Sequence, residues 1–462
     1  MAETLEGLAA KLKEGQASSV SLVERALERI ERLDSRLNSF VALDPSAALA
    51  AAKASDARRA RGQAKSPLDG IPISVKDNIH AAGFPTTWGS RALKDYRPAK
   101  DELPVARLKS AGMIVIGKTN VPEFTLEGYT RNDLFGVTRN PWNPDLTPGG
   151  SSGGAAASVA AGLVPAAIGT DGGGSIRRPA CHTGLTGFKP SIGRWPRADG
   201  LPAIITDFET VGSLVRTVED TLLIDAILRG PDPRDWRSSY APAPSSPKKT
   251  ARILYIPRFG VSPVDPEVAS EVENFARRLK SIGHDVREGK VFFDLDLAAR
   301  VWHIVSRSGV AWLTAENPTY ENLVGASARA MAADGRKISG ADYLGALESV
   351  AAIRRLAGEL FQGVDLVLTP TAAALPWPAE KPYPDRIDGK PAGPRDHAIF
   401  TGWVNIAGVP ALNLPIGLSR SGLPIGAHLV AAFGADDQLL AFAREVSRAV
   451  PPPPLPELEA AP

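Results

Sequence analysis

The stretch that decides the fold runs from Pro148 to Pro190 and reads PGGSSGGAAASVAAGLVPAAIGTDGGGSIRRPACHTGLTGFKP. It holds two serines, Ser151 and Ser175, which lie 24 residues apart and are each set among glycines. A helix is expected at 155–161 and a strand at 163–168 between them. Glycines beside a serine allow a sharp turn that presents the hydroxyl, and they bring bare N–H groups close to a substrate oxygen. This pairing favours a catalytic role over a structural turn or an anion-binding nest.

Strand and helix patterns alternate on both sides of this stretch. Strands are predicted at 70–75, 113–116, 252–256, 365–369, 411–416 and 425–430, and helices at 45–61, 104–110, 217–228, 266–281 and through much of 292–360. Such alternation is typical of a mostly parallel sheet that is covered by helices on both faces. The sequence therefore predicts an α/β protein.

Length and composition exclude several classes of protein. The 462 residues are enough for about three domains or for one large α/β unit with insertions. With 44% hydrophobic and 23% charged residues, the chain is not a disordered one. Its formal net charge of +2 gives no reason to expect a nucleic-acid partner. The single cysteine, Cys181, excludes an intramolecular disulfide and a Cys-rich metal site.

A cytoplasmic, membrane-free protein is expected. The opening MAETLEGLAAKLKEG lacks the uncharged core of a secretory signal. The longest charge-free run lies between Asp145 and Asp171, but six of the 25 residues from Leu146 to Thr170 are glycine and Pro165 lies inside it. A spanning helix needs about 20 continuous apolar residues.

Two shorter glycine motifs offer competing interpretations. Gly112–Thr119 satisfies the nucleotide-binding expression G-x-x-x-x-G-K-[ST], but its four variable residues are themselves a predicted strand and cannot curl around a phosphate. Gly149–Gly153 satisfies the G-x-S-x-G expression of α/β-hydrolases, which would make Ser151 the nucleophile of a triad with a downstream histidine. The residues before Gly149 read as a loop rather than a strong strand, which weakens this second interpretation, although the histidines leave it open.

The central stretch and five further blocks resemble the amidase signature family over nearly the whole chain. The other blocks are LDGIPISVKD at 68–77, AGMIVIGKTN with the following Glu123-Phe124 at 111–124, TPT at 369–371, NIAGVPA at 405–411 and GLPIG at 422–426. The resemblance implies one large α/β domain on a central mixed, mostly parallel sheet, with helices on both faces. It also implies a hydrolase of carbon–nitrogen bonds other than peptide bonds that uses no metal or organic cofactor.

By position, the resemblance assigns a Ser-Ser-Lys triad. Ser175 corresponds to the nucleophile, Ser151 to a bridging serine that follows a cis peptide bond, and Lys76 to the base. The N–H groups of Gly172, Gly173, Gly174 and Ser175 correspond to the oxyanion hole.

The chemistry of Lys76 can be argued independently of the family. Hydrolysis of an amide needs an activated nucleophile, stabilisation of the oxyanion and a proton for the leaving nitrogen. A neutral lysine could take the proton of Ser175 through Ser151, but neutralising a solvated lysine at pH 7 costs roughly 4–5 kcal/mol. Burial at the end of an apolar strand would reduce that cost. The alternative for Lys76 is an ion pair with Asp77 or Asp171.

Substrate-binding residues are less well defined. The resemblance makes Arg177 structural and places Arg178 where malonamidase-like members contact a substrate carboxylate, although a structural salt bridge is an open alternative. Thr125 and Trp302 are expected at the acyl pocket, and His303, Trp312, Trp377 and Trp403 lie in the regions that shape it in relatives. Tryptophans in helical stretches are more often core than pocket residues, so core packing is the alternative for them. Cys181 and His182 are expected to be packing residues.

Three functions are compatible with these residues. The first is a stand-alone, bacterial-type amidase acting on a small amide, arylalkyl and indole-3-acetamide-like compounds included. The second is the glutaminase A subunit of a tRNA-dependent amidotransferase; residues 321–339 depart from that subunit's pattern, while 340–344 look like free-standing amidases. The third is an inactive binding protein on the same scaffold. Members of the family are often dimers, so the resemblance also allows a homodimer.

The expected organisation is a domain at 1–450 and a Pro-rich, disordered tail at 451–462. Within the domain, 1–65 form N-terminal helices and 66–230 the catalytic core. A helical, substrate-shaping part is expected at 231–364, after an exposed connection at 241–247, and C-terminal strands and a helix at 365–450.

Overall fold

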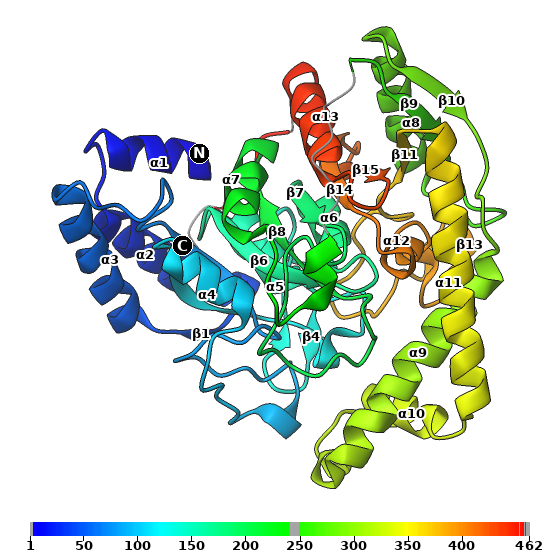
Figure 1. Cartoon of the computed structure of the whole chain (residues 1–462), viewed down its shortest axis with the longest axis horizontal. Helices are drawn as coiled ribbons and strands as arrows, with labels where there is room; N and C mark the ends of the chain where they lie inside the picture. The colour runs from blue at the N-terminus through cyan, green and yellow to red at the C-terminus, as the bar shows by residue number, and fades with distance from the viewer. Residues whose placement is uncertain (1–2, 241–248, 452, 457, 459–462) are drawn as a thin grey trace.

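The computed structural model describes residues 3–240, 249–451, 453–456 and 458 (Figure 1). Its helices are α1 Leu5–Lys13, α2 Ser19–Leu37, α3 Pro45–Ala60, α4 Leu103–Ser110, α5 Gly153–Ala160, α6 Arg177–Thr183, α7 Val218–Leu228, α8 Pro266–Ser281, α9 Leu295–Glu316, α10 Ala326–Gly335, α11 Gly340–Gly363, α12 Gly402–Ala407 and α13 Asp436–Ala449. Its strands are β1 Phe40–Leu43, β2 Pro72–Lys76, β3 Ile114–Thr119, β4 Arg131–Asn132, β5 Gly136–Val137, β6 Ala166–Asp171, β7 Thr186–Lys189, β8 Thr210–Val215, β9 Arg252–Tyr255, β10 Asp285–Glu288, β11 Leu366–Pro370, β12 Arg386–Ile387, β13 Lys390–Pro391, β14 Ala411–Leu418 and β15 Pro424–Ala431. The predicted connection at 241–247 and residues 452, 457 and 459–462 of the predicted tail lie outside the described residues.

One large mixed sheet organises the described chain, with the strand order β1-β3-β2-β6-β8-β7-β14-β15-β11-β9-β10. The predicted α/β domain on a mixed sheet is therefore confirmed. Parallel pairing is confined to two blocks, β3-β2-β6 and β11-β9-β10. The strand pairs from β6 across to β11, and the pair β1-β3 at the edge, are antiparallel. The parallel share is smaller than strand–helix alternation suggests, because a short turn such as residues 419–423 can join only antiparallel strands.

The parallel block β3-β2-β6 positions the candidate site. All residues of β2 and β6 are buried, as expected for parallel strands covered on both faces. Because β2 and β6 run in the same direction, their carboxyl ends reach the same edge of the sheet. Lys76 ends β2 and Asp171 ends β6, so the chain delivers Lys76 and the glycines before Ser175 to one place.

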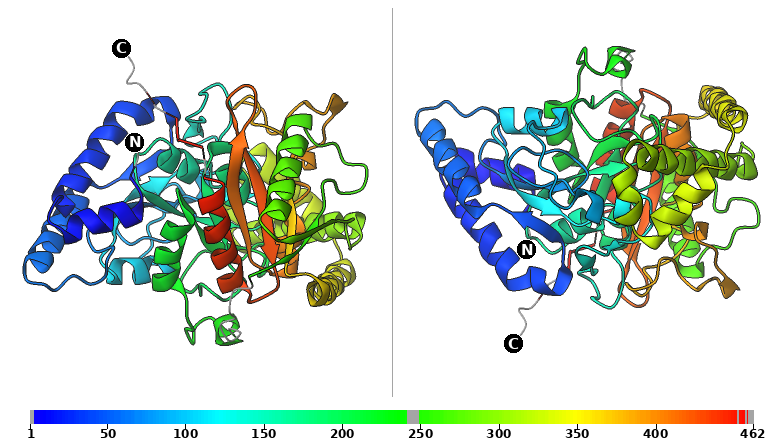
Figure 2. Two further views of the ribbon diagram at one scale, coloured as in Figure 1. Left: turned by 90° about the horizontal axis from the view of Figure 1, so that it is seen from above. Right: turned by 90° about the horizontal axis from the view of Figure 1, so that it is seen from below.

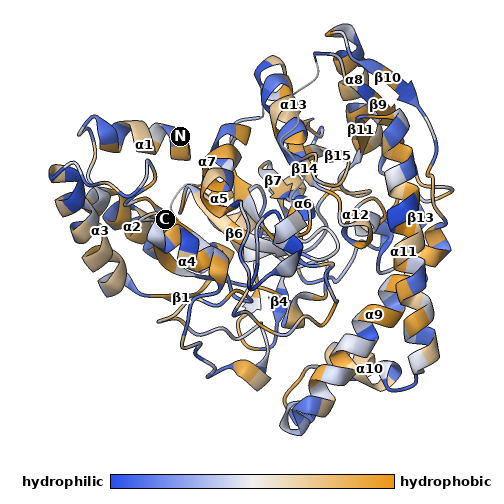
Figure 3. Ribbon diagram, in the orientation of Figure 1, coloured by the Kyte–Doolittle hydropathy of each residue, from blue (hydrophilic) through white to orange (hydrophobic). Residues whose placement is uncertain are grey.

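Helices cover both sides of the sheet (Figures 1 and 2). Near the C-terminal strands, α8 and α13 pack on β14 and β15 from one side, while α6 contacts the same strands from the other. The long helices α9 and α11 and the shorter α10 form a layer at the edge of the molecule, and hydrophilic and hydrophobic residues both occur along them (Figure 3). None of the helices in the described part of the chain combines the length and apolarity that a bilayer crossing requires.

The small helix α5 shows why the central stretch is so rich in small residues. Every residue of α5 is buried. A Cβ on Gly154 would lie 2.5 Å from the backbone nitrogen of Asn120 and 2.6 Å from the carbonyl oxygen of Ser39. The helix therefore packs directly against neighbouring backbone, which only glycine at this position permits.

Candidate active site

Lys76 lies fully buried with its amine directed at the first serine loop. Its Nζ is 2.8 Å from Ser151 Oγ, 2.9 Å from Thr170 Oγ1 and 3.1 Å from the Thr170 carbonyl oxygen. Burial lowers the pKa of Lys76 to about 7, while the negative charges of Glu209 and Asp171 act in the opposite direction. The amine is thus poised to be neutral near physiological pH.

The alternative ion pairs for Lys76 are not observed. Asp77 lies 3.8 Å from Lys118, and Asp171 is bound by Arg177. In the described part of the chain, the lysine instead meets two hydroxyls and a carbonyl. This environment suits an uncharged amine better than a charged one.

The Ser151 loop turns sharply beneath the second serine loop. Gly149 has φ +83°, and the peptide bond between Gly150 and Ser151 is cis. A Cβ on Gly150 would lie 2.4 Å from the carbonyl oxygen of Tyr129, so this position has room only for glycine. The N–H of Ser152 donates to the carbonyl oxygen of Ser175 at 3.1 Å, which joins the two serine loops.

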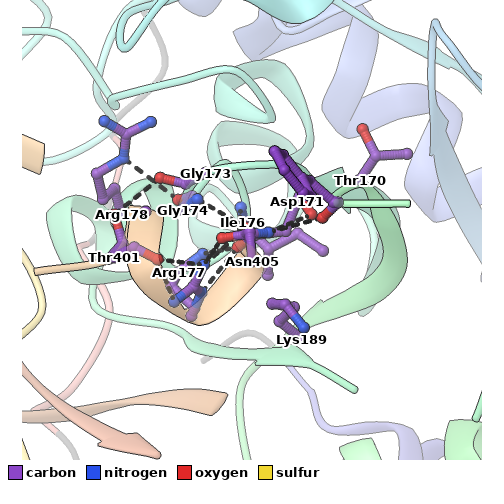
Figure 4. Close-up of polar contacts among 12 residues, drawn as sticks. Thr170, Asp171, Gly173, Gly174, Ile176, Arg177, Arg178, Lys189, Thr401 and Asn405 are labelled. Carbon is purple, nitrogen blue, oxygen red and sulfur yellow. Dashed lines mark hydrogen bonds and ion pairs between the residues drawn. The ribbon is translucent and has the colours of Figure 1, made fainter. Parts of the chain in front are cut away.

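The Ser175 loop is fixed from below by the carboxylate of Asp171 (Figure 4). Asp171 accepts hydrogen bonds from the N–H groups of Gly174 at 2.7 Å and Ile176 at 3.1 Å. This finding corrects the prediction for Gly174, whose N–H is already paired and is not free for a substrate oxygen. Sequence could not show this, because the direction of an N–H depends on the loop's dihedral angles. In the described residues, the N–H groups of Gly172, Gly173 and Ser175 have no protein acceptor.

Arg177 completes the support under the loop, as its predicted structural role requires. Its guanidinium binds Asp171 through Nε at 2.9 Å and Nη2 at 2.8 Å. Asn405 of α12 donates Nδ2 to the Asp171 carbonyl at 2.8 Å and accepts from Arg177 at 2.6 Å (Figure 4). Although burial opposes it, Arg177 holds the pKa of Asp171 well below its usual range. The network is charged, buried and fully paired.

A cavity of about 500 Å³ opens on Ser175. The predicted residues Gly172, Gly173, Arg178, Thr125, Trp302 and His303 also line it. Three tryptophans from the regions that shape the pocket in relatives do not line it. Trp312 lies exposed on α9, Trp403 packs against Phe292 and Phe293, and Trp377 packs against His182 and His397. The sequence pattern did not show which of these tryptophans meets the cavity.

Arg178 enters the cavity without an acidic partner. It is only 4% exposed, and its acceptors are His397 Nε2 at 3.2 Å and the carbonyl oxygens of Gly150 at 3.3 Å and Gly174 at 3.4 Å. Burial, and then the nearby charge of Arg395, lower the pKa of Arg178 to about 9. The salt-bridge alternative for Arg178 is therefore not observed among the described residues.

Arg395 is a cavity residue that sequence reasoning missed. Its guanidinium carbon lies 5.0 Å above the ring of Trp302, in cation–π geometry. It comes from the turn at 393–398, which has no motif of its own. Only the packing of this turn over α9 brings the side chain to the cavity.

The competing interpretations of the glycine motifs are not supported by the geometry. Residues 114–119 of the nucleotide-binding expression are the buried strand β3, and Lys118 donates to the carbonyl oxygen of Ile79 at 2.6 Å. Ser151 meets Lys76 rather than a histidine within the described structure. Cys181 and His182 are buried, as expected of packing residues. No cluster of three or more metal-ligating side chains occurs among the residues described.

Known proteins share both the sequence and the fold. The amidase family profile matches residues 21–440. The chain belongs to the amidase signature family. Like other members, it is a hydrolase of carbon–nitrogen bonds other than peptide bonds. The match covers the Lys76 block, both serine loops and the C-terminal blocks.

Relatives within the amidase signature family carry different functions. The A subunit of glutamyl-tRNA(Gln) amidotransferase from Chloroflexus aggregans is 36% identical, covering 91% of this chain and 90% of the relative. A Mycobacterium tuberculosis protein named "Putative amidase AmiA2" is 37% identical, with 96% and 92% covered. Among solved structures, a bacterial aryl acylamidase has a TM-score of 0.88 at 29% identity, covering 97% of this chain and 96% of that one.

Proposed function

We propose that this amidase hydrolyses a small carboxylic amide through Ser175, Ser151 and Lys76. The observation that carries the proposal is the buried amine of Lys76, 2.8 Å from Ser151 Oγ, because the Ser151 loop is hydrogen-bonded to the loop of Ser175, which lines the cavity. A lysine with a pKa of about 7 is neutral in a large fraction of molecules at pH 7 and can accept a proton. The cavity volume of about 500 Å³ suits a small organic substrate.

In the proposed mechanism, Ser175 Oγ attacks the amide carbonyl while its proton passes through Ser151 to Lys76. The N–H groups of Gly172, Gly173 and Ser175 stabilise the oxyanion. The proton then returns along the same route to the leaving nitrogen, and the C–N bond breaks to leave an acyl-enzyme. Water hydrolyses the acyl-enzyme with the same base.

For the acyl group, Trp302, Thr125 and Arg178 form the proposed contacts. The ring of Trp302 lies against Gly173, since a Cβ there would come within 2.9 Å of it. An arylalkyl acyl group could pack on this ring, and Arg178 could bind an acyl group that carries a carboxylate.

A stand-alone amidase is the first choice and a glutaminase subunit the second. The fold's likeness to the aryl acylamidase, at a TM-score of 0.88, exceeds that to the Thermotoga maritima amidotransferase A subunit, at 0.80. The second candidate is supported by the relatives of 34–36% identity that are amidotransferase A subunits. Ammonia or amine release from a panel of aryl, aliphatic and malonamate amides and glutamine distinguishes the two. Turnover of glutamine alone, only with a partner protein added, would favour the amidotransferase.

The nucleophile is tested by the Ser175→Ala variant. We expect turnover to fall at least about 10⁴-fold, because the attacking hydroxyl is lost while the fold is kept. Ser158→Ala is the matched control, since Ser158 is a buried serine of α5 that hydrogen-bonds Ser74, away from the cavity. A fluorophosphonate label should map to Ser175 by peptide mass. Labelling of Ser151 instead, or turnover retained by Ser175→Ala, would overturn the assignment.

A further inference from the structure

A second, smaller cavity adjoins the first one. Its volume is about 190 Å³, and four residues line both cavities: Thr125, Leu126, Ile205 and Glu209. The junction lies beside the predicted oxyanion glycines, because a Cβ on Gly172 would come within 2.4 Å of Ile205 and 3.7 Å of Glu209. The smaller cavity therefore begins beside Gly172, and Arg178 lines only the larger of the two cavities.

The walls of the smaller cavity are apolar, and its two carboxylates share one guanidinium. Trp88, Phe124, Leu201, Ile204 and Ile205 supply the apolar surface. Arg197 is shared by two carboxylates, Glu102 at 2.6 Å and Glu209 at 2.7 Å. The remaining cation in the lining, Arg237, is bound by Asp235 at 2.7 Å. The two carboxylates and two guanidiniums of the lining balance, but the Glu102–Arg197–Glu209 group by itself carries one negative charge in excess.

The larger cavity has the opposite character at its other end. Arg178 has only neutral acceptors, and Arg395 lies over Trp302 without an acidic partner within 4 Å in the described structure. Two of the carboxylates that line this cavity have partners of their own, since Glu127 accepts from Ser327 and Asp396 accepts from the N–H of Gly393. Glu209, at the junction of the two cavities, shares Arg197 with Glu102, and the third arginine, Arg307, lies 3.7 Å from Asp334.

We propose that the smaller cavity is the subsite for the leaving amine and that Glu209 binds the amine as its ammonium form. The inference rests on the proposed function. Hydrolysis converts a neutral amide and water, RCONHR′ + H₂O, into RCOO⁻ and R′NH₃⁺, so the two products have opposite charges. The acyl product would remain at the arginine end, and the ammonium would leave past Glu209. The amine leaves as the acyl-enzyme forms and becomes an ammonium by taking up a proton from water, so Glu209 attracts it away from Ser175 before the carboxylate is released.

The volume and walls of this subsite define the class of amine. A cavity of about 190 Å³ with aromatic and aliphatic walls has room for an alkyl or arylalkyl group, whereas ammonia is too small to fill it. The substrates would therefore be secondary amides of small apolar amines. The carboxylate of Glu209 also lies 3.5 Å from Asn78 Nδ2, which donates to Thr170 Oγ1 beside Lys76. This chain of contacts places the ammonium site next to the proton route.

Direct binding tests the subsite without turnover. Benzylammonium and n-butylammonium are titrated into the full-length protein by calorimetry, with neutral benzyl alcohol as the uncharged probe. Glu209→Gln should weaken ammonium binding at least tenfold and leave the alcohol unchanged. Glu127→Gln, the same change at a carboxylate that lines the larger cavity but not the smaller one, should alter ammonium binding less than twofold. Equal affinities in wild type and Glu209→Gln, or equal losses in both variants, would overturn the proposal.

A variant that fills the smaller cavity provides the second test, which does not depend on whether the Glu209→Gln protein folds. Ala198→Phe fills the smaller cavity. It should raise KM for an N-benzyl amide at least tenfold and leave KM for the primary amide of the same acid within about twofold. An equal effect on both amides would contradict the subsite. Failure of the proposed function has another signature, since Ser175→Ala would then keep its turnover whether or not the ammonium binds.

Discussion

Arg177 and Arg178 are neighbours in sequence, lie on the same helix α6 and are both buried, yet they have opposite surroundings (Figure 4). Arg177 faces the sheet, where Asp171 and Asn405 bind its guanidinium. Arg178 faces the cavity, where it meets only a histidine nitrogen and two carbonyl oxygens. The arginine with a carboxylate partner supports the Ser175 loop, whereas the arginine without one among the described residues is the residue that we propose for ligand binding. Burial alone does not separate the two roles.

The largest expected effect is a loss of stability when Arg177, the arginine with a carboxylate partner, is replaced. Arg177→Met leaves the carboxylate of Asp171 buried without its cation, which should lower the free energy of unfolding by about 3–5 kcal/mol. Arg178→Met removes a charge that has no acidic partner, so its effect should stay within about 1 kcal/mol. Urea denaturation of both variants measures the difference. Similar losses would show that the two arginines do not differ as described.

Lys76 resembles Arg178, because it is also buried without an adjacent carboxylate. Its pKa of about 7 in the folded protein is below the ordinary value of 10.5, so the unfolded chain binds more protons between these pH values. Stability should therefore rise with pH from about 7 to 10.5. Lys76→Met removes this contribution and should raise the free energy of unfolding at pH 7 by about 1–3 kcal/mol while abolishing turnover.

The pH dependence of unfolding in the two proteins measures this contribution. The other buried lysines, Lys118 and Lys189, are present in both and cancel in the difference. A Lys76→Met variant less stable than wild type at pH 7 would show that the amine contributes to the fold like Arg177.

Replacement of Arg178, the arginine without an acidic partner in the described structure, should change ligand affinity. If Arg178 binds a carboxylate, Arg178→Gln should weaken inhibition by the carboxylate product about tenfold, which is about 1.4 kcal/mol. Inhibition constants at fixed pH provide the measurement, with the neutral primary amide as the matched ligand. A uniform loss for both ligands would assign Arg178 to the shape of the cavity rather than to charge recognition.

The smallest expected effect is a shift of the pH profile. Because Lys76 acts as a base only when neutral, kcat/KM should rise with pH through a midpoint near 7. The negative charge of Glu209 raises the pKa of Lys76, so Glu209→Gln should move this midpoint to lower pH. Profiles measured with a primary amide avoid the effect of an amine subsite. A midpoint that moves upward would contradict the charge relation between the two residues.

Local pattern predicted many elements closely. The helix expected at 45–61 is Pro45–Ala60, and the strand expected at 70–75 is Pro72–Lys76, because proline, glycine and apolar runs mark such boundaries. The strands β7 and β8, in contrast, were not predicted. Their central place in the sheet depends on pairing with β6 and β14, which are distant in sequence.

The sequence by itself determined the family and the three residues proposed for the proton relay, because serines, glycines and a lysine at these spacings form an unusual and specific pattern. Only the tertiary structure decided which backbone N–H groups are free, which tryptophans face the cavity and which arginine lacks an acidic partner. These properties depend on directions in space. Residues adjacent in the chain, such as Arg177 and Arg178, point in different directions from one helix, and no linear pattern records what each of them meets.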